Sequence, residues 1–413
     1  MQRRTQGRCT GLIATAPLAI LLAACGTAAT LPPTSHPVLG STPTPTVVPP
    51  PSPSAIPTPD PETPLAVLTT GQGFEAVNAQ GVEQWETTNA KMAQIFGVSL
   101  QQIITEANDA NWPVDPVQVE VAGPNLVLFY GAADNLTRVA VISHVGTLLG
   151  TASIPGYSFN GGFYVSSPDG TQWAWSLDQS PANQINNLGP GTTYRHHGVI
   201  EVAGLNESVH TVYQWSAPAG FTEELLGWYS TGIILHRFEH WQCGPGGDYP
   251  FGDPGAAWFA LNPSTAKLTE LFTGNQQYLL TGDGVTVAAL LNDPHAVLIN
   301  GATYSESKSS IDFYGNGQPA DISPDGAHVS ISRTNPINPC GGDYSIPNPT
   351  LTVELVTVAD HSHVDIPNMA ADGWWGTTDI VTLDPNLNVW IDTLQGKPVA
   401  ELGSYGVVLG VLQ

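Results

Sequence analysis

Hydrophobic and polar positions alternate in short runs from Leu65 to Gln413, and Gly, Pro, Asn and Asp separate these runs. Alternation with a period of two is typical of β-strands, because successive side chains of a strand point to opposite faces. Runs of this length between turn-forming residues indicate many short strands rather than helices. The pattern therefore predicts an all-β domain over residues 65–413.

One turn motif occurs twice, each time between two predicted strands. The copies are Ser167-Pro168-Asp169-Gly170 and Ser323-Pro324-Asp325-Gly326. Proline presets φ, aspartate caps the turn through its side chain, and glycine accepts a positive φ, so each copy predicts a tight hairpin. The motif resembles the Ser-Pro-Asp-Gly hairpin of TolB-like propeller repeats, which in that family joins the innermost strand of a blade to the second strand.

The resemblance implies a single β-propeller with about seven four-stranded blades, although the spacing also permits six or eight. Candidate inner strands begin near residues 118, 163, 225, 278, 319, 373 and 403. Their spacing of roughly 30–60 residues brackets the length of a propeller blade. Residues 405–412 are expected to join the strands of 65–86 and close the ring, which removes free sheet edges. A pair of β-sandwiches with ordinary Asp-Gly turns is the alternative.

Residues 87–108 interrupt the β pattern. Their apolar positions lie at helical spacing: Met92, Ile95, Phe96, Leu100, Ile103 and Ile104. Gly97-Val98 separates two short helices, and Ser99 is expected to cap the second helix. The pair is somewhat similar to the helices of LysM glycan-binding modules, but the opening Gly-Asp-Thr of that family is absent. We expect an inserted helical hairpin that packs on a blade.

Residues 1–24 have the pattern of an export signal. Three arginines, Arg3, Arg4 and Arg8, precede an apolar run over 11–22. That run is shorter than the roughly 20 residues of a membrane-spanning helix. The following Leu22-Ala23-Ala24-Cys25 resembles the lipobox of bacterial lipoproteins, which implies cleavage before Cys25 and a lipid on its thiol. The implied location is the extracytoplasmic face of the bacterial cell membrane. An ordinary secretory signal with an incidental cysteine is the alternative.

Residues 25–64 predict a tether between this lipid anchor and the β domain. Within residues 31–64, 13 of the 34 residues are proline. Proline removes backbone donors and fixes φ, so the segment favours extended polyproline II and cannot build a core. At about 3.1 Å per residue, the segment spans up to roughly 100 Å.

Charge narrows the choice of partners. Only 11% of the residues are charged, against about 25% in an average domain, and the net charge is −24. A chain this acidic is poorly suited to binding nucleic acid in particular, because the phosphates of nucleic acid need neutralisation by Lys or Arg. The negative charge favours cationic partners or bound cations. The alternative is that the charged residues only keep the surface solvated.

Two cysteines remain if Cys9 leaves with the signal and Cys25 carries the lipid. Cys243 and Cys340 stand in similar loops, each followed by glycines and an Asp-Tyr pair. An even pair in an oxidising compartment predicts a disulfide between them, with two buried free thiols as the alternative. In the propeller interpretation both loops lie on one face. The candidate binding face comprises Asp248, Tyr249, Asp343, Tyr344, His240, Trp241 and Arg333.

No catalytic motif accompanies these loops. The chain lacks a Gly-x-Ser-x-Gly elbow, His-Glu-x-x-His, a glycine-rich phosphate loop and paired-cysteine zinc spacing. Asp248, Asp253 and Asp343 are candidate Ca²⁺ ligands, but they lack the spacing of known calcium motifs, so neither a cofactor nor a metal is predicted.

The leading hypothesis is a non-enzymatic, surface-anchored propeller that binds a protein, peptide or glycan partner. The first alternative is a secreted carbohydrate hydrolase or lyase that uses carboxylates near the axis, such as Asp321 and Asp372. The second is cell-wall attachment in which residues 87–108 read a glycan.

Replacing Cys25 with serine is expected to abolish lipid attachment, because the thiol is the group that takes the lipid. Metabolic labelling with an alkyne fatty acid and membrane fractionation measure this directly. The label should disappear in Cys25→Ser and persist in Cys9→Ser. Equal labelling of the two variants would contradict the prediction that Cys25 carries the lipid.

Overall fold

The computed structural model describes fourteen stretches of the chain: residues 63–105, 117–131, 136–155, 164–179, 195–219, 221–239, 257–273, 276–290, 293, 295–306, 309–311, 320–335, 350–404 and 408–413. The chain divides into two units, Met1–Ser54 and Ala55–Gln413, and every described residue belongs to the second. Among the described residues, no helix is both long and apolar enough to cross a membrane.

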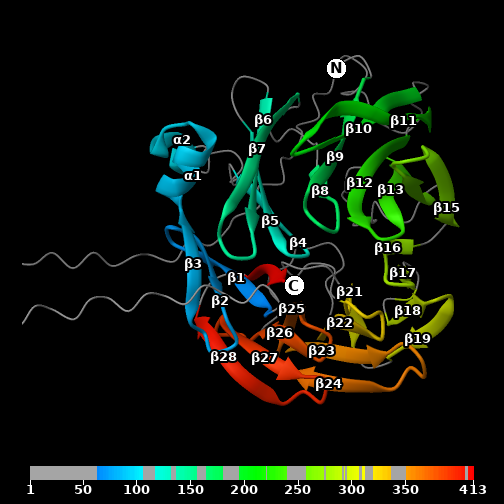
Figure 1. Ribbon diagram of the computed structural model, residues 1–413. Helices are drawn as coiled ribbons and strands as arrows, with labels where there is room; N and C mark the ends of the chain where they lie inside the picture. Colours follow the sequence, from blue (N-terminus) through cyan, green and yellow to red (C-terminus); the bar gives the residue numbers. More distant parts are fainter. Residues whose placement is uncertain are drawn as a thin grey trace, which may run out of the picture. The chain divides into compact units, whose positions relative to one another are not determined.

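Seven antiparallel sheets stand around a common centre (Figure 1), and we number them as blades 1–7. Blade 1 contains, from its inner to its outer strand, β29 (Val408–Leu412), β1 (Leu65–Thr70), β2 (Gly73–Val77) and β3 (Glu83–Thr88). Blade 2 contains β4 (Val117–Ala122), β5 (Asn125–Gly131), β6 (Leu136–Ser143) and β7 (Leu148–Pro155). Blade 3 contains β8 (Tyr164–Ser166), β9 (Gln172–Asp178), β10 (Arg195–Gly204) and β11 (Glu207–Ala219). Blade 4 contains β12 (Phe221–Tyr229), β13 (Gly232–Glu239), β14 (Ala257–Asn262) and β15 (Lys267–Thr273).

The remaining blades follow the same plan. Blade 5 contains β16 (Gln276–Gly282), β17 (Val285–Leu290), β18 (Ala296–Ile299) and β19 (Ala302–Ser305). In blade 6, β20 (Ser310–Ile311) and β21 (Ala320–Ile322) both pair with β22 (His328–Asn335), and β23 (Thr350–Thr357) and β24 (His363–Pro367) follow. Blade 7 contains β25 (Ala370–Trp375), β26 (Asp379–Leu383), β27 (Asn388–Thr393) and β28 (Pro398–Ser404). The prediction of a seven-bladed propeller is confirmed, and each inner strand begins within a few residues of its predicted position.

The C-terminal strand completes the first blade. β29 pairs antiparallel with β1, with Leu65 opposite Leu412 and Val67 opposite Gly410. Figure 1 shows β29 in red beside β1 in blue. The backbone N–H of Gln413 then donates to the carbonyl of Gly123 in blade 2 at 3.0 Å. The expected closure by residues 405–412 is therefore observed in its described part, and β1 has a partner on both sides.

The described residues form seven hydrophobic core clusters, and each lies between neighbouring blades. The alternation of a strand sends its side chains to two clusters. On β5, Leu126 and Leu128 pack toward blade 1, whereas Val127 and Phe129 pack toward blade 3. A middle strand is therefore buried on both faces, and β5 is buried at every position. The outer strand β7, in contrast, is mostly exposed.

The two Ser-Pro-Asp-Gly turns have the same hydrogen bonds. Ser167 Oγ donates to Asp169 at 2.6 Å and accepts from the N–H of Gln172 at 3.0 Å. In the second copy, Ser323 Oγ donates to Asp325 at 2.7 Å and accepts from the N–H of His328 at 2.9 Å. Both glycines have a positive φ, 66° and 68°. The motif therefore builds one turn twice, between the inner and second strands of blades 3 and 6.

A helical hairpin follows blade 1, as expected. Its helices are α1 (Asn89–Phe96) and α2 (Leu100–Thr105). Ser99 Oγ accepts from the N–H of Gln102 at 3.2 Å, and Gln102 Oε1 accepts from the N–H of Ser99 at 3.0 Å, which is a capping box. Met92, Ala93 and Phe96 are buried in the cluster between blades 1 and 2. The hairpin is therefore part of the propeller core.

Shortening Leu412 tests the closure. Leu412 is fully buried, so Leu412→Ala is expected to lower the free energy of unfolding by about 2–5 kcal/mol. Leu149 on β7 is 50% exposed, and Leu149→Ala is the matched control with little expected effect. Chemical denaturation measures both variants. Equal losses would contradict the placement of β29 inside blade 1.

Candidate functional site

Most of the predicted binding face lies outside the described residues. Cys25, Cys243, Cys340, Asp248, Asp253, Tyr249, Asp343, Tyr344, His240 and Trp241 all fall there. The lipid attachment, the disulfide and this part of the binding face stay predictions.

Arg333 is the one described member of that face, and its side chain is buried. The guanidinium on β22 is 1% exposed and forms an ion pair with Glu354 on β23, which is equally buried. Its Nη1 donates to the carbonyl of His295 at 3.1 Å. The alternation on β22 places Arg333 on the same face as Ile331, which packs against blade 5. Arg333 is thus an internal residue and not the surface residue expected from the sequence.

His236 is also internal. Its ring stacks on Trp258, with centroids 4.0 Å apart and planes at 15°. Burial lowers the pKa of His236 to about 4, so the ring stays neutral at ordinary pH. This residue packs between blades.

Two adjoining cavities lie where the inner strands meet, and together we call them the axial channel. Their volumes are about 520 and 440 Å³, and they share Val121, Tyr229 and Leu409. Residues of all seven inner strands line them: β4, β8 and β12 mainly the first, β21, β25 and β29 mainly the second, and β16 both. The ring therefore encloses one polar site that no single blade builds alone.

Bulges direct particular side chains into the axial channel. In β12, β25 and β29 the register shifts by one residue, and the extra residues are Leu226, Asp372 and Leu409. All three line the channel. A bulge frees one residue from the strict alternation and re-aims its side chain. At Asp372 the bulge coincides with a place in the channel lining.

Four carboxylates line the axial channel. Glu120 and Asp283 lie on the first cavity, and Asp321 and Asp372 on the second. The described lining includes no Lys, Arg or His. Burial raises the pKa of Glu120 to about 7 and the pKa of Asp321 and Asp372 to about 6. Desolvation disfavours the ionised forms of Glu120, Asp321 and Asp372, so a positive charge in the channel would stabilise them.

Glu120 also joins two blades. Its carboxylate accepts from the backbone N–H of Ser166 on β8 at 2.8 Å and from Gln118 Nε2 at 2.7 Å. The same amide donates to the carbonyl of Tyr164 at 3.1 Å. These hydrogen bonds lower the pKa of Glu120, but burial outweighs them. Asp321 and Asp372 are therefore more available to a ligand than Glu120.

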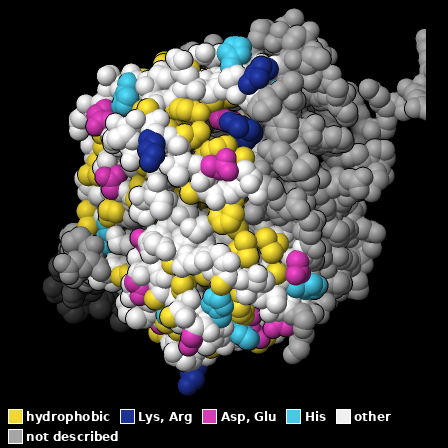
Figure 2. Space-filling view, turned by 90° about the vertical axis from the view of Figure 1, so that its right-hand side faces the viewer, with side chains coloured by type: hydrophobic (Ala, Val, Ile, Leu, Met, Phe, Trp, Pro, Cys, Tyr) yellow, Lys and Arg dark blue, Asp and Glu magenta, His cyan; other side chains and the backbone are white. Residues whose placement is uncertain are grey.

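One outer face of the propeller carries side chains of both charges (Figure 2). Figure 2 shows the side that carries β15 and β19, where acidic and basic side chains stand apart among hydrophobic and uncharged ones. The channel differs from this face because it gathers charges of one sign.

Sequence reasoning found part of this site. Asp321 and Asp372 were expected near the axis, and both line the second cavity. Glu120 was missed, because the alternating segment Val117–Ala122 suggests that its polar residues face solvent. Only the position of the neighbouring blade shows that this face is covered.

No family model and no curated protein matches this sequence. Several solved structures are similar to parts of this chain. An oligogalacturonate lyase in complex with manganese has a TM-score of 0.43 and 13% identity, over 68% of this chain and 76% of that chain. Prolyl oligopeptidase B from Galerina marginata has a TM-score of 0.44 and 9% identity, over 74% of this chain and 46% of that chain. An uncharacterized protein from Listeria monocytogenes EGD-e has a TM-score of 0.40 and 10% identity, over 72% and 86%. These likenesses concern the fold alone and carry no argument about activity.

The buried Asp321 makes stability depend on pH. Its pKa lies near 6 in the folded protein and near 3.8 ordinarily. Between these values the folded protein holds a proton that the unfolded chain has lost, so stability falls as the pH rises through this window. Asp321→Asn removes the effect and keeps an acceptor for the N–H of Ile322. Between pH 4 and pH 7, the free energy of unfolding of the variant should rise by roughly 1–3 kcal/mol relative to that of the wild type.

Denaturation at a series of pH values measures this gain. Asp360→Asn is the control, because hydrogen bonds from the backbone N–H and hydroxyl of Ser362 lower the pKa of this exposed carboxyl. That variant should lose stability relative to the wild type as the pH rises. A flat difference for Asp321→Asn would show that its carboxyl is not buried.

Proposed function

We propose that this chain is a lipid-anchored binding protein whose axial channel accepts a positively charged group of a peptide or protein partner. The supporting observation is the channel lining, which includes four carboxylates and, among its described residues, no cationic side chain. A cation in the channel would gain a full charge interaction with Asp321 and Asp372 and would relieve the cost of burying them.

Anchoring and export belong to the same proposal. The signal pattern and Cys25 support attachment at the extracytoplasmic face of a bacterial membrane, and the proline-rich segment 31–64 supports a spacer. A tethered binding domain of this kind captures partners outside the cell. The loops that carry Cys243 and Cys340 are proposed to add contacts at the face on which they lie.

The carbohydrate hydrolase or lyase remains the second candidate, because Asp321 and Asp372 line one cavity. Acid–base catalysis needs one group that donates a proton and one that accepts it, so the two environments should push the pKa values apart. Here the same cause, burial, raises both pKa values to about 6. Carboxyls whose pKa values are raised alike suit binding of a positively charged group better than a division of acid and base roles.

Glycan binding by α1 and α2 has less support. The apolar face of α1 is buried in the propeller core, so Met92 and Phe96 are not offered to a ligand. The exposed Leu100 and Ile104 on α2 are the parts that such a role would use.

Calorimetry with a pentalysine peptide tests the proposal. Asp321→Asn and Asp372→Asn should each weaken binding about tenfold, which corresponds to about 1.4 kcal/mol. Binding by the wild type should tighten from pH 5 to pH 8, because the buried carboxyls lose their protons over that range. It should also weaken with added salt.

The matched controls are Asp360→Asn and Glu401→Gln, which remove one exposed charge each. They separate the axial channel from general attraction to an acidic surface. Channel variants that bind no worse than these controls would refute the proposal. Release of reducing sugars from a neutral polysaccharide that Asp321→Asn abolishes would establish the hydrolase instead.

A further inference from the structure

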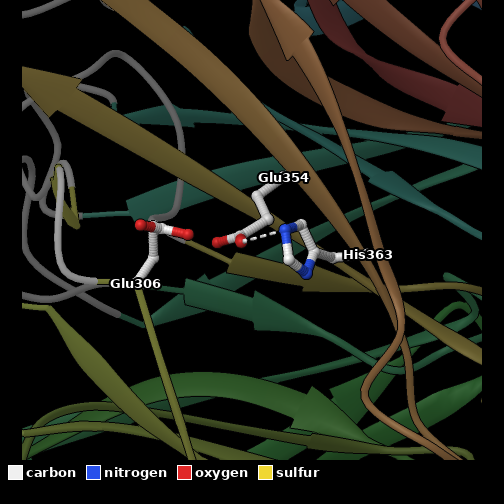
Figure 3. Close-up of side chains that lie close together, drawn as sticks. All are labelled: Glu306, Glu354 and His363. Atoms are coloured by element: carbon white, nitrogen blue, oxygen red, sulfur yellow. Dashed lines mark ion pairs between the residues drawn. The ribbon is translucent and has the colours of Figure 1, made fainter.

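A second group of polar side chains lies away from the axial channel, between blades 5 and 6. It comprises Glu306, directly after β19, Glu354 on β23 and His363 at the start of β24. One oxygen of each carboxylate and one ring nitrogen all lie within 4.8 Å of one another. Figure 3 shows the carboxylates of Glu306 and Glu354 directed toward each other, with the imidazole of His363 on the far side of Glu354.

Strand register brings these residues together. In blade 6, Glu354 lies opposite Asp365, and Val356 lies opposite His363. Glu354 and His363 are therefore diagonal neighbours on one face of the sheet. Glu306 arrives from blade 5, so the three groups meet only because the two blades pack together.

The buried carboxylate of Glu354 is held in one orientation. Arg333 Nε donates to Oε2, and the hydroxyl of Tyr304 donates to Oε1. Oε1 is also the oxygen nearest to His363 Nε2, at 3.8 Å. Arg333 and Tyr304 thus fix the carboxylate, with Oε1 turned toward the histidine. An arginine in this position orients a metal-binding carboxylate from outside the coordination shell.

The separation between Glu354 and His363 is close to the spacing of two ligands of one ion. Ligand atoms about 2.1 Å from one metal ion lie roughly 3.4 Å apart in a tetrahedron. The 3.8 Å from Oε1 to Nε2 is too long for a direct hydrogen bond and close to that spacing. The side chain of His363 is 41% exposed, so an ion can reach the site from solvent.

The net charge of this group of side chains also favours a bound cation. Arg333 neutralises one carboxylate, while Glu306 and Asp365 add two further negative charges beside it. We propose that Glu306, Glu354 and His363 bind a divalent transition-metal ion such as Mn²⁺ or Zn²⁺. One imidazole nitrogen with two carboxylate oxygens suits these ions, whereas Ca²⁺ and Mg²⁺ prefer oxygen ligands alone. Water would fill the remaining positions.

Titration of the full chain with Mn²⁺, followed by electron paramagnetic resonance of the free ion, tests this site. Manganese avoids thiols, so the cysteines do not compete. One ion should bind per chain, Zn²⁺ should displace it, and His363→Ala and Glu306→Gln should each weaken binding at least about tenfold. Glu354 is left intact, because its loss would strand the buried Arg333.

The controls are His210→Ala and Glu83→Gln, two exposed positions on β11 and β3. They should bind Mn²⁺ as the wild type does. Asp321→Asn should also bind normally, which separates this site from the axial channel. Absence of binding in the millimolar range, or equal binding by His363→Ala, Glu306→Gln and the controls, would overturn the proposal. Thermal unfolding without metal confirms that each variant is folded.

Discussion

The pairing of β29 with β1 is the constraint on which the rest of the propeller depends. It pairs residues that are 340 to 347 positions apart in the sequence and gives both edges of β1 a partner. Each blade buries its two faces against its neighbours, so an open ring would expose a face of two blades at once. Closure therefore stabilises sheets that share no residue with blade 1. The ring also creates the axial channel, because its lining needs every inner strand in place.

Polar groups in this all-β core are tolerated where neighbouring strands satisfy them. Blade 6 holds the buried pair of Arg333 and Glu354, and blade 4 holds the pair of Arg237 and buried Glu223. In each case the guanidinium also lies near an aromatic ring, that of Tyr304 or Phe259. A buried ion pair contributes little net stability, but breaking it leaves an unpaired charge and is costly. These pairs therefore favour one register of the strands and one packing of the blades.

The axial channel and the cluster of Glu306, Glu354 and His363 differ in how charge is handled. The channel gathers carboxylates without a fixed cation in its described lining, and burial raises the pKa values of Asp321 and Asp372 to about 6. The cluster contains a fixed cation that holds one carboxylate oxygen, and a histidine faces the other. The first arrangement suits a positively charged group that enters and leaves. The second suits a small ion held by ligands of fixed direction.

The sequence by itself determined the strands, the Ser-Pro-Asp-Gly turns and the helical hairpin, because these follow from alternation and local turn chemistry. It predicted about seven blades but also allowed six or eight, and the packed sheets decided the number. It also placed Asp321 and Asp372 near the axis, since repeat position locates an inner strand. Only the tertiary structure decided that Arg333 is buried, that Glu120 lies under a neighbouring blade, and that Glu306 meets Glu354 and His363. The physical reason is that strand alternation defines two faces, but packing between blades decides which face is covered and by what.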